Sequence, residues 1–234
     1  EGMSEGNEKV RAQRAVLFEL ENVALGARRI TYDVIENVLA DKDISLNPGM
    51  FARYYRDGRL AEFISRILED QGKTRLSEKK LIADIDQGIR LSLTDSGAKV
   101  TKGVTALLDR GRKEGFFLGA VSNYDKDVYG TLIRNLGLDE NQIQIMSREE
   151  TKESVLTAET WTELIDGFKV KPPLCMTITT GLEGFRSALS AGARCLVVPD
   201  EFTNHHDFGG ADLVVDTLDE DAIDQGLSIL GRRL

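Results

Sequence analysis

Short apolar runs that alternate with stretches of helical periodicity are the feature that most constrains the fold of this 234-residue chain. From residue 102 onward, the apolar runs occupy residues 116–121, 142–146, 174–178, 195–198 and 211–215. The stretches between them carry apolar residues at helical spacing, and Gly137 and Gly192 stand where two of these helices are expected to end. Strands that alternate with helices are typical of a parallel sheet covered on both faces. We therefore predict an α/β fold in three layers, with the sheet in the middle.

One more apolar run, residues 15–18, leads directly into two carboxylates, Glu19 and Glu21. If the extended backbone continued, these two side chains would point the same way, because a strand repeats every two residues. Two acids that converge at a strand end suggest a metal or phosphate site. A strand that simply stops in polar residues is the alternative that these residues leave open.

Between this strand and residue 102, the chain shows helical periodicity and no convincing strand. Apolar stripes over residues 30–39, 60–68 and 81–89 each fit one face of a helix. Asn47 before Pro48, and Ser77, are residue types that cap helix N-termini. We predict a helical module of about 70 residues, inserted between two parts of one sheet.

Composition excludes several partners and locations. A formal net charge of -9 and a pI near 4.9 argue against nucleic acid and against anionic membranes, which both reward a basic surface. Cys175 and Cys195 lie among apolar residues, so buried reduced thiols are expected. With no apolar run long enough to span a bilayer and no signal-peptide pattern, we predict a cytoplasmic protein, with an organelle stroma as the alternative.

The residues that follow the predicted strands are polar. Ser122 and Asn123 follow one strand, Thr179 and Thr180 follow another, and Glu19 and Glu21 follow the first. Ligands of parallel sheets bind beyond the carboxyl ends of the strands, so these side chains are expected to meet. Hydroxyl, amide and carboxylate groups, with a nearby lysine, are what a phosphate site needs.

Four segments carry a resemblance to a known family. Residues 18–23, Phe-Glu-Leu-Glu-Asn-Val, are similar to a first motif Phe-Asp-x-Asp-Gly-Val, and residues 120–123 fit a strand that ends in Ser or Thr followed by Asn. Lys152 lies where a third-motif lysine is expected, with Lys169 and Lys171 as alternatives, and residues 175–192 fit the fourth motif. On these segments the chain resembles the haloacid dehalogenase-like hydrolase superfamily, in its helical-cap branch with phosphoglucomutase-like and phosphoglycolate-phosphatase-like members.

The resemblance implies a domain division and a fold. It implies a Rossmann-like hydrolase core over residues 11–26 and 97–234, with a helical cap domain over residues 27–96. Residues 1–10 are expected to be a flexible N-terminal segment or a cloning remnant.

The resemblance also implies site residues. Glu19 stands at the position of the nucleophile, Glu21 at that of the general acid and base, and Lys152 at that of the catalytic lysine. Ser122 and Asn123 would bind phosphate. Glu19, Glu21 and Thr180 stand at the magnesium positions, although the family has Asp at all three.

These departures fall on reactive positions. The additional methylene of Glu19 moves its carboxylate by about 1 Å, which can cost roughly a hundredfold in rate. Thr180 removes a carboxylate from a cation that is usually held by one or two of them. Lys152 could neutralise Glu19 or Glu21, or lie solvated at the surface.

Two functions follow as hypotheses. The first is a family member with lost or impaired phosphatase activity that acts as a binding or regulatory module, with no cofactor. The alternative is a magnesium-dependent phosphatase of a small phosphorylated metabolite, with Glu19 as nucleophile and Glu21 as general acid and base. Dehalogenase chemistry ranks third, because it also needs an Asp nucleophile. The sequence identifies no protein partner.

Two further motifs have ordinary explanations. The adjacent pair His205-His206 is expected to be solvated surface rather than a metal site, because no further ligands are suitably spaced. Phe51, Tyr54 and Tyr55 are expected to pack within the helical module rather than to form a ligand cage.

Overall fold

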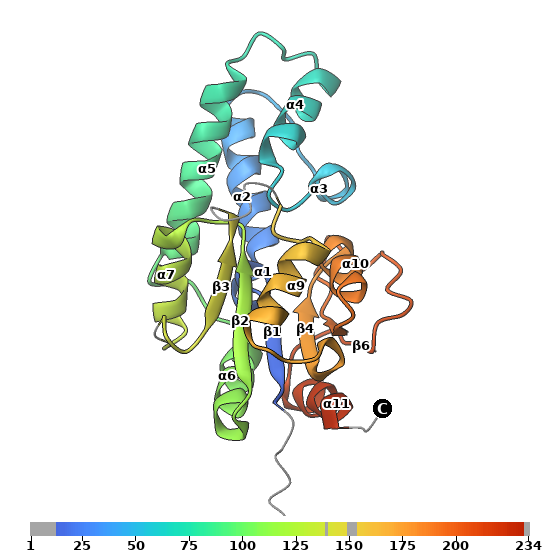
Figure 1. Cartoon of the computed structure of the whole chain (residues 1–234). Coiled ribbons are helices and arrows are strands. Elements are labelled where there is room, and N and C mark those ends of the chain that lie inside the picture. The colour runs from blue at the N-terminus through green and yellow to red at the C-terminus, as the bar shows by residue number, and fades with distance from the viewer. Residues whose placement is uncertain (1–12, 139, 149–153, 232–234) are drawn as a thin grey trace, which may run out of the picture.

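A parallel sheet forms the centre of the molecule (Figure 1). The computed structural model of the chain describes residues 13–138, 140–148 and 154–231. Within them the strand order is β3-β2-β1-β4-β5-β6, and each neighbouring pair is parallel. The strands are β1 (Ala15–Glu19), β2 (Phe117–Ser122), β3 (Gln144–Ser147), β4 (Cys175–Thr179), β5 (Arg194–Val197) and β6 (Leu213–Val214).

Helices cover both faces of this sheet. Successive side chains of a strand point to opposite faces, and both sets are buried here. Val16 and Phe18 of β1 belong to one apolar cluster, whereas Ala15 and Leu17 belong to the other. On the first face lie α6 (Lys102–Glu114) and α11 (Glu220–Gly231), and on the second lie α9 (Ala158–Gly167) and α10 (Leu182–Ser190). The short η1 (Pro172–Leu174) leads into β4, and α7 (Lys126–Asn135) follows β2. The predicted α/β fold with a helix-covered parallel sheet is confirmed.

A set of helices between β1 and β2 stands beyond the carboxyl ends of the strands (Figure 1). It contains α2 (Ala27–Ala40), α3 (Pro48–Tyr54), α4 (Leu60–Asp70) and α5 (Glu78–Thr94), and we call residues 27–94 the helical insertion. The Asn47 side chain accepts a hydrogen bond from the Met50 N–H at 2.9 Å, which caps α3. Ser77 caps α5 in the same way through the Lys80 N–H at 3.4 Å. The domain boundaries and the cap role of this insertion stay predictions.

The backbone at the two acids differs from continued extension. β1 ends at Glu19, and α1 (Leu20–Leu25) begins at the next residue, so Glu21 lies in the first turn of a helix. The reason is that Leu20, Val23 and Ala24 bury one helical face, and Gly26 ends the helix in the left-handed conformation, with φ 64°. Glu19 and Glu21 therefore point to different neighbours.

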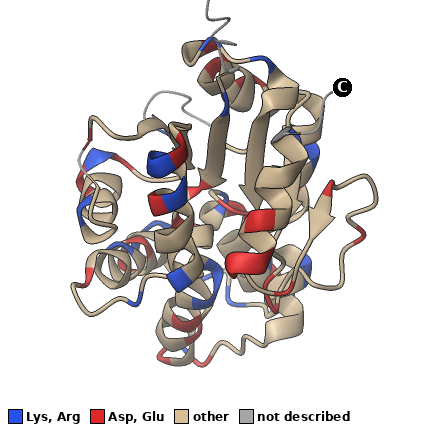
Figure 2. Ribbon diagram, turned by 90° about the horizontal axis from the view of Figure 1, so that it is seen from below, with Lys and Arg blue, Asp and Glu red and all other residues tan. Residues whose placement is uncertain are grey.

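The distribution of surface charge, the length of the helices and the state of the two cysteines follow what the composition indicated. Basic and acidic residues are interspersed over the helices (Figure 2). No helix of the described ranges is long and apolar enough to cross a bilayer. Cys175 and Cys195 are free and buried, and burial raises the pKa of their thiols to about 12 and about 11. Buried free thiols are thus confirmed.

Candidate functional site

Glu19 lies at the carboxyl end of the central strand, and both of its carboxylate oxygens accept hydrogen bonds. The Thr180 N–H donates to Oε1 at 3.2 Å, and the Thr180 hydroxyl donates to Oε2 at 2.7 Å. The Asn22 side-chain amide also donates to Oε2, at 3.2 Å. The pairing of Phe18 with Ile178 in neighbouring strands explains why the two segments meet here. The acid at the predicted nucleophile position is thus bound by the threonine at a predicted metal position.

Glu21 binds the two residues that were predicted to hold phosphate. Its Oε1 accepts a hydrogen bond from the Ser122 hydroxyl, and its Oε2 accepts one from the Asn123 N–H at 3.4 Å. Burial raises the pKa of Glu21 to about 7, and the hydrogen bond from Ser122 only partly opposes this. The sequence prediction brought these three residues together correctly, but within the structure the Ser122 hydroxyl serves Glu21.

A buried arginine, Arg28, is the main residue that sequence reasoning missed. It begins the insertion in the first turn of α2, and its side chain is 7 % exposed. Its Nη2 lies 2.5 Å from an Asp57 carboxylate oxygen, and its Nη1 lies 2.6 Å from Asp200. Nη1 also donates to the Thr180 hydroxyl at 2.9 Å, and Nη2 lies 3.9 Å from Glu19 Oε2.

The charges around Arg28 explain why it stays ionised inside the protein. Burial alone would lower its pKa, but the carboxylates of Asp57, Asp200 and Glu19 outweigh burial and raise the pKa of Arg28. Burial likewise raises the pKa of Glu19, and Arg28 opposes this increase. The result is a buried cluster of one cation and three acids.

This cluster does not fit the magnesium site that the resemblance implies. Thr180 offers a neutral hydroxyl in place of a carboxylate, and the Arg28 guanidinium already contacts both Thr180 and Glu19. Within the described ranges, no group of three or more His, Cys, Asp or Glu residues could hold a metal ion. The structure supplies a fixed cation of its own instead.

One sequence signal could have indicated Arg28. Arg28 and Arg29 lie in the first turn of a helix, where the helix dipole disfavours cations. Arg29 is half exposed and pairs with Asp33 at 3.0 Å, whereas Arg28 points into the protein. Two of its acidic partners, Asp57 and Asp200, lie 29 and 172 residues away in the sequence, so only the fold identifies them.

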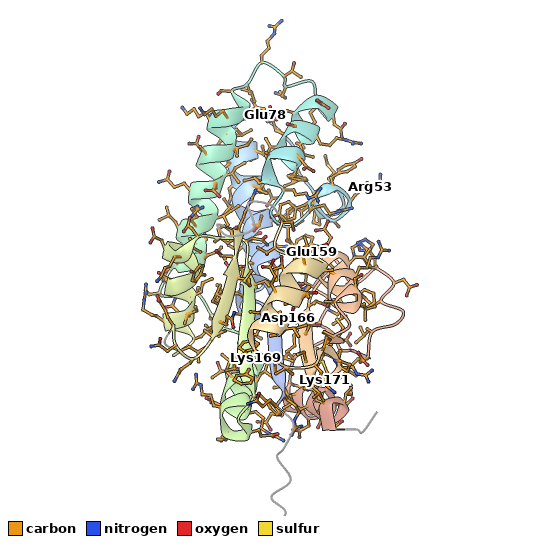
Figure 3. The ribbon with its side chains drawn as sticks, in the orientation of Figure 1. Arg53, Glu78, Glu159, Asp166, Lys169 and Lys171 are labelled. Atoms are coloured by element: carbon orange, nitrogen blue, oxygen red, sulfur yellow. The ribbon has the colours of Figure 1, made fainter. Side chains whose placement is uncertain are left out.

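The structure describes two of the three lysines that could serve the third motif. Lys152 lies outside the described residues. Lys169 and Lys171 come before η1 and β4, at the amino end of the strands, where Cys175 pairs with Ala15 (Figure 3). Glu19 lies at the opposite end of the sheet. These two alternatives to Lys152 are therefore wrong, because they face away from the site.

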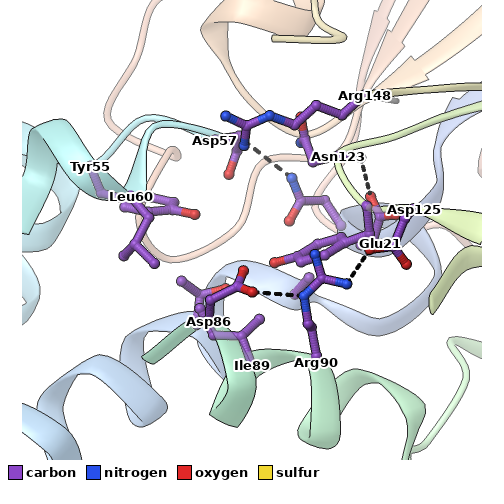
Figure 4. A pocket seen from close by; sticks show the side chains of 15 residues that line it. Glu21, Tyr55, Asp57, Leu60, Asp86, Ile89, Arg90, Asn123, Asp125 and Arg148 are labelled. Carbon is purple, nitrogen blue, oxygen red and sulfur yellow. Dashed lines mark hydrogen bonds and ion pairs between the residues drawn. The ribbon is translucent and has the colours of Figure 1, made fainter. Parts of the chain in front are cut away.

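A cavity of about 290 Å³ lies beside Glu21, between the insertion and the sheet (Figure 4). We call it the central cavity; charged residues in its wall are Glu21, Asp57, Asp86, Arg90, Asp125 and Arg148. Arg90 pairs with Asp86 at 2.7 Å and with Asp125. Arg148 forms no ion pair with another described residue. The buried Asn123 Oδ1, also in this wall, has no hydrogen-bond partner among the described residues.

The aromatic residues of the insertion pack as predicted. Phe51 is 1 % exposed, stacks on Tyr55 with 4.5 Å between ring centroids, and meets Phe63 edge-on at 5.7 Å. Tyr55, however, also lines the central cavity. The rings of the two histidines lie 4.2 Å apart between centroids and are tilted by 53°, with His205 exposed and His206 half buried.

Comparisons with known proteins agree with this architecture. No family model matches the chain. The protein YhcW of Bacillus subtilis is 21 % identical over 191 residues, which cover 81 % of this chain and 85 % of YhcW. The crystal structure of CbbY from Rhodobacter sphaeroides in complex with phosphate aligns with a TM-score of 0.71 at 18 % identity, covering 91 % of this chain and 99 % of CbbY.

A third comparison carries the family's own description. The family IA, variant 3 HAD hydrolase of Entamoeba histolytica aligns with a TM-score of 0.75 at 19 % identity, covering 94 % of this chain and all of that one. The chain has the fold of the haloacid dehalogenase-like hydrolases. The resemblance seen in the sequence motifs is therefore confirmed at the level of the fold, and fold alone does not establish an activity.

Proposed function

We propose that this haloacid dehalogenase-fold protein has lost efficient phosphoryl transfer and acts as a binding or regulatory module. The observation that carries this proposal is the pair of hydrogen bonds from Thr180 to the two oxygens of Glu19. A carboxylate nucleophile needs a free oxygen aimed at the phosphorus atom. Glu19 is 3 % exposed, and both of its oxygens already accept hydrogen bonds.

The Arg28 cluster supports the same proposal. A metal ion in phosphoryl transfer neutralises charge that develops on the phosphoryl oxygens, and it needs carboxylate ligands to do so. Here Glu19 faces a guanidinium that is held by Asp57 and Asp200. The Arg28 guanidinium is therefore paired with carboxylates of the chain and is not free for a substrate phosphate.

The ligand that suits the proposed binding role is a small phosphorylated metabolite in the central cavity. Arg148 is the cation of that wall with no ion-pair partner among the described residues, and the amide of Asn123 lies beside it (Figure 4). CbbY, which has the same fold, has been crystallised with phosphate and with xylulose-1,5-bisphosphate. The regulatory role and the cytoplasmic location stay predictions.

One observation favours the alternative, a magnesium-dependent phosphatase. A general acid and base works best with a pKa near the working pH, and burial raises the pKa of Glu21 to about 7. Glu21 would then assist attack by Glu19 on a small phosphate ester. This alternative requires Glu19 to leave Thr180 and Arg28 to move.

Hydrolysis of p-nitrophenyl phosphate, with and without magnesium, separates the two functions. We expect the unmodified chain to show no metal-dependent turnover above that of Glu19→Ala. Glu163→Ala, which removes an exposed acid on α9, serves as the matched control. Metal-dependent turnover that Glu19→Ala abolishes and Glu163→Ala leaves intact would contradict the proposal and establish the phosphatase.

A further inference from the structure

A second cavity lies on the other side of Arg28, between α3, the start of α10 and the loop that follows β5. Its volume is about 210 Å³, and we call it the lateral cavity. Arg28 and Asp57 line it, so their ion pair forms one wall. Tyr55 and Asp57 also line the central cavity, which places the two cavities back to back. None of the motif residues at the ends of β1 and β2 lines it.

The floor of the lateral cavity is apolar and aromatic. Phe51 and Phe202 are 1 % and 2 % exposed and pack against each other with 4.8 Å between ring centroids. Tyr55 stacks on Phe51, and Leu182 of α10 completes this surface. Such a floor suits a flat apolar group rather than a bare inorganic ion.

The rim of the cavity is basic, which is unusual in a chain of net charge -9. Because Arg28 is neutralised by Asp57, the remaining charges in the wall are Arg56 and Arg186 against Glu183. Arg186 forms no ion pair within the described part of the chain. Among the described residues, the Arg56 guanidinium donates only to backbone carbonyls, those of Arg53 at 3.2 Å and Tyr55 at 2.7 Å. Both arginines are exposed, so their charge faces solvent and the cavity mouth.

His206 adds an unsatisfied polar atom to the same wall. Its Nδ1 is buried and has no hydrogen-bond partner among the described residues. Burial lowers the pKa of His206, and His205, Arg56, Arg28 and Arg186 lower it further. The positive charges of three arginines therefore act on one imidazole, and an anion bound there would offset them. In addition, no side chain caps the N-terminus of α10 at Gly181, which leaves backbone N–H groups of Leu182 and Glu183 at this wall.

From this combination we infer that the lateral cavity binds a small organic anion, with an apolar body on the Phe51–Phe202 floor and an acidic group between Arg56, Arg186 and His206. The volume is below the roughly 300–1,000 Å³ of drug-sized sites, so the ligand is of fragment size. A carboxylate and a phosphate both satisfy the rim, because arginine pairs with either in a forked geometry. The inference does not rest on the loss of catalysis proposed above.

Calorimetric titration with phenylphosphonate tests the inference, because this anion has an aromatic body and cannot be hydrolysed. We expect saturable binding that Arg186→Gln and Arg56→Gln each weaken by about tenfold. Both side chains are exposed, so the variants should fold, which circular dichroism checks. Benzoate in place of phenylphosphonate shows whether a carboxylate serves as well, and either anion binding in this pattern supports the inference.

Two further variants locate the binding. Arg112→Gln removes an exposed arginine on α6 and is the matched control, which should not change the affinity. Arg148→Gln removes an arginine of the central cavity and shows whether an anion bound there contributes to the signal. The inference is overturned if neither anion binds at millimolar concentration, if only Arg148→Gln weakens binding, or if neutral benzyl alcohol binds equally well. Because phenylphosphonate carries no ester bond, these results do not depend on whether p-nitrophenyl phosphate is hydrolysed.

Discussion

Arg28 holds together residues from three separate parts of the chain. It contacts Asp57 from the insertion, Thr180 after β4, and Asp200 after β5. Taking an ion out of water costs several kcal/mol, and this cost is recovered only when its partners are well placed. With three acids and a hydroxyl around it, the guanidinium meets that condition. Removing it would leave Asp57 and Glu19 buried without their counter-charge.

Replacement of Arg28 by methionine should therefore destabilise the protein strongly. We expect a loss of about 3–5 kcal/mol in the free energy of unfolding, measured by urea denaturation. Arg29→Met is the matched control, since Arg29 is the neighbouring residue and forms half-exposed ion pairs with Asp33 and Glu201. It should cost far less than Arg28→Met, because exposed ion pairs contribute little to stability. Equal losses for the two variants would show that the Arg28 cluster contributes no more than a surface pair.

The raised pKa of Glu21 predicts that the folding stability falls as the pH rises, which is opposite to the effect of most carboxylates. Its pKa is about 7 in the folded chain and 4.5 in an ordinary setting, so the folded state binds the proton more tightly. Stability from this residue is complete below pH 4.5 and is lost as the pH rises through 7, by on the order of 3 kcal/mol at about 1.4 kcal/mol for each pKa unit.

The measurement is the urea denaturation midpoint between pH 5 and pH 8, for the unmodified chain and for Glu21→Gln. Glutamine does not titrate, so the decline with rising pH should be smaller in the variant. Parallel curves for the two proteins would mean that Glu21 has an ordinary pKa in the folded state.

At the scale of elements, the sequence was sufficient for the sheet and insufficient for the site. The apolar runs identified each strand because burial on both faces leaves a continuous apolar signal, as at Phe117–Ser122. Element ends were less accurate: β6 is only Leu213–Val214, whereas the apolar run covers residues 211–215. Helix and strand ends depend on capping and pairing that single-residue patterns record weakly.

Part of the site could likewise be predicted from the sequence, and part could not. Glu19 meets Thr180, and Glu21 meets Ser122 and Asn123, because the carboxyl ends of parallel strands share one edge. Asp57 and Asp200, which pair with Arg28, lie 29 and 172 residues from it, and no local pattern links them. The same holds for the lateral cavity, whose wall combines α3, α10 and a loop.

Close packing of α10 against β1 yields a prediction about Gly184. A Cβ atom at this position would lie 2.0 Å from Glu19 Oε1 and 3.2 Å from Thr179 Cβ. Gly184→Ala should therefore destabilise the fold by about 1–3 kcal/mol, as overpacking does. Shortening the acid with Glu19→Asp withdraws the clashing oxygen, so the cost of Gly184→Ala should be smaller in that background.

Gly130→Ala is the control for this double-mutant cycle. Gly130 is also helical, but a Cβ there would meet no atom closer than 3.5 Å. Alanine at this position should be neutral or stabilising by up to about 1 kcal/mol. If Gly184→Ala costs the same in the Glu19→Asp background as in the unmodified chain, the glycine does not make room for the longer acid.

At the scale of the whole molecule, the insertion and the sheet are joined across the site by charge. Arg28 of the insertion reaches Asp200 after β5 at 2.6 Å, and Arg90 of α5 reaches Asp125 at the start of α7. These two ion pairs connect the insertion to segments that follow β5 and β2. Where the family resemblance implies a metal ion, this chain has fixed side chains.

Calorimetric titration of magnesium into the protein tests most directly whether side chains have replaced the metal ion. We expect no saturable binding by the unmodified chain at millimolar magnesium, because Arg28 and Thr180 take the place of the ion and its third acid. The double variant Arg28→Met with Thr180→Asp removes the guanidinium and restores a carboxylate, so it should gain magnesium binding. Saturable binding by the unmodified chain that Glu19→Ala abolishes would contradict the account.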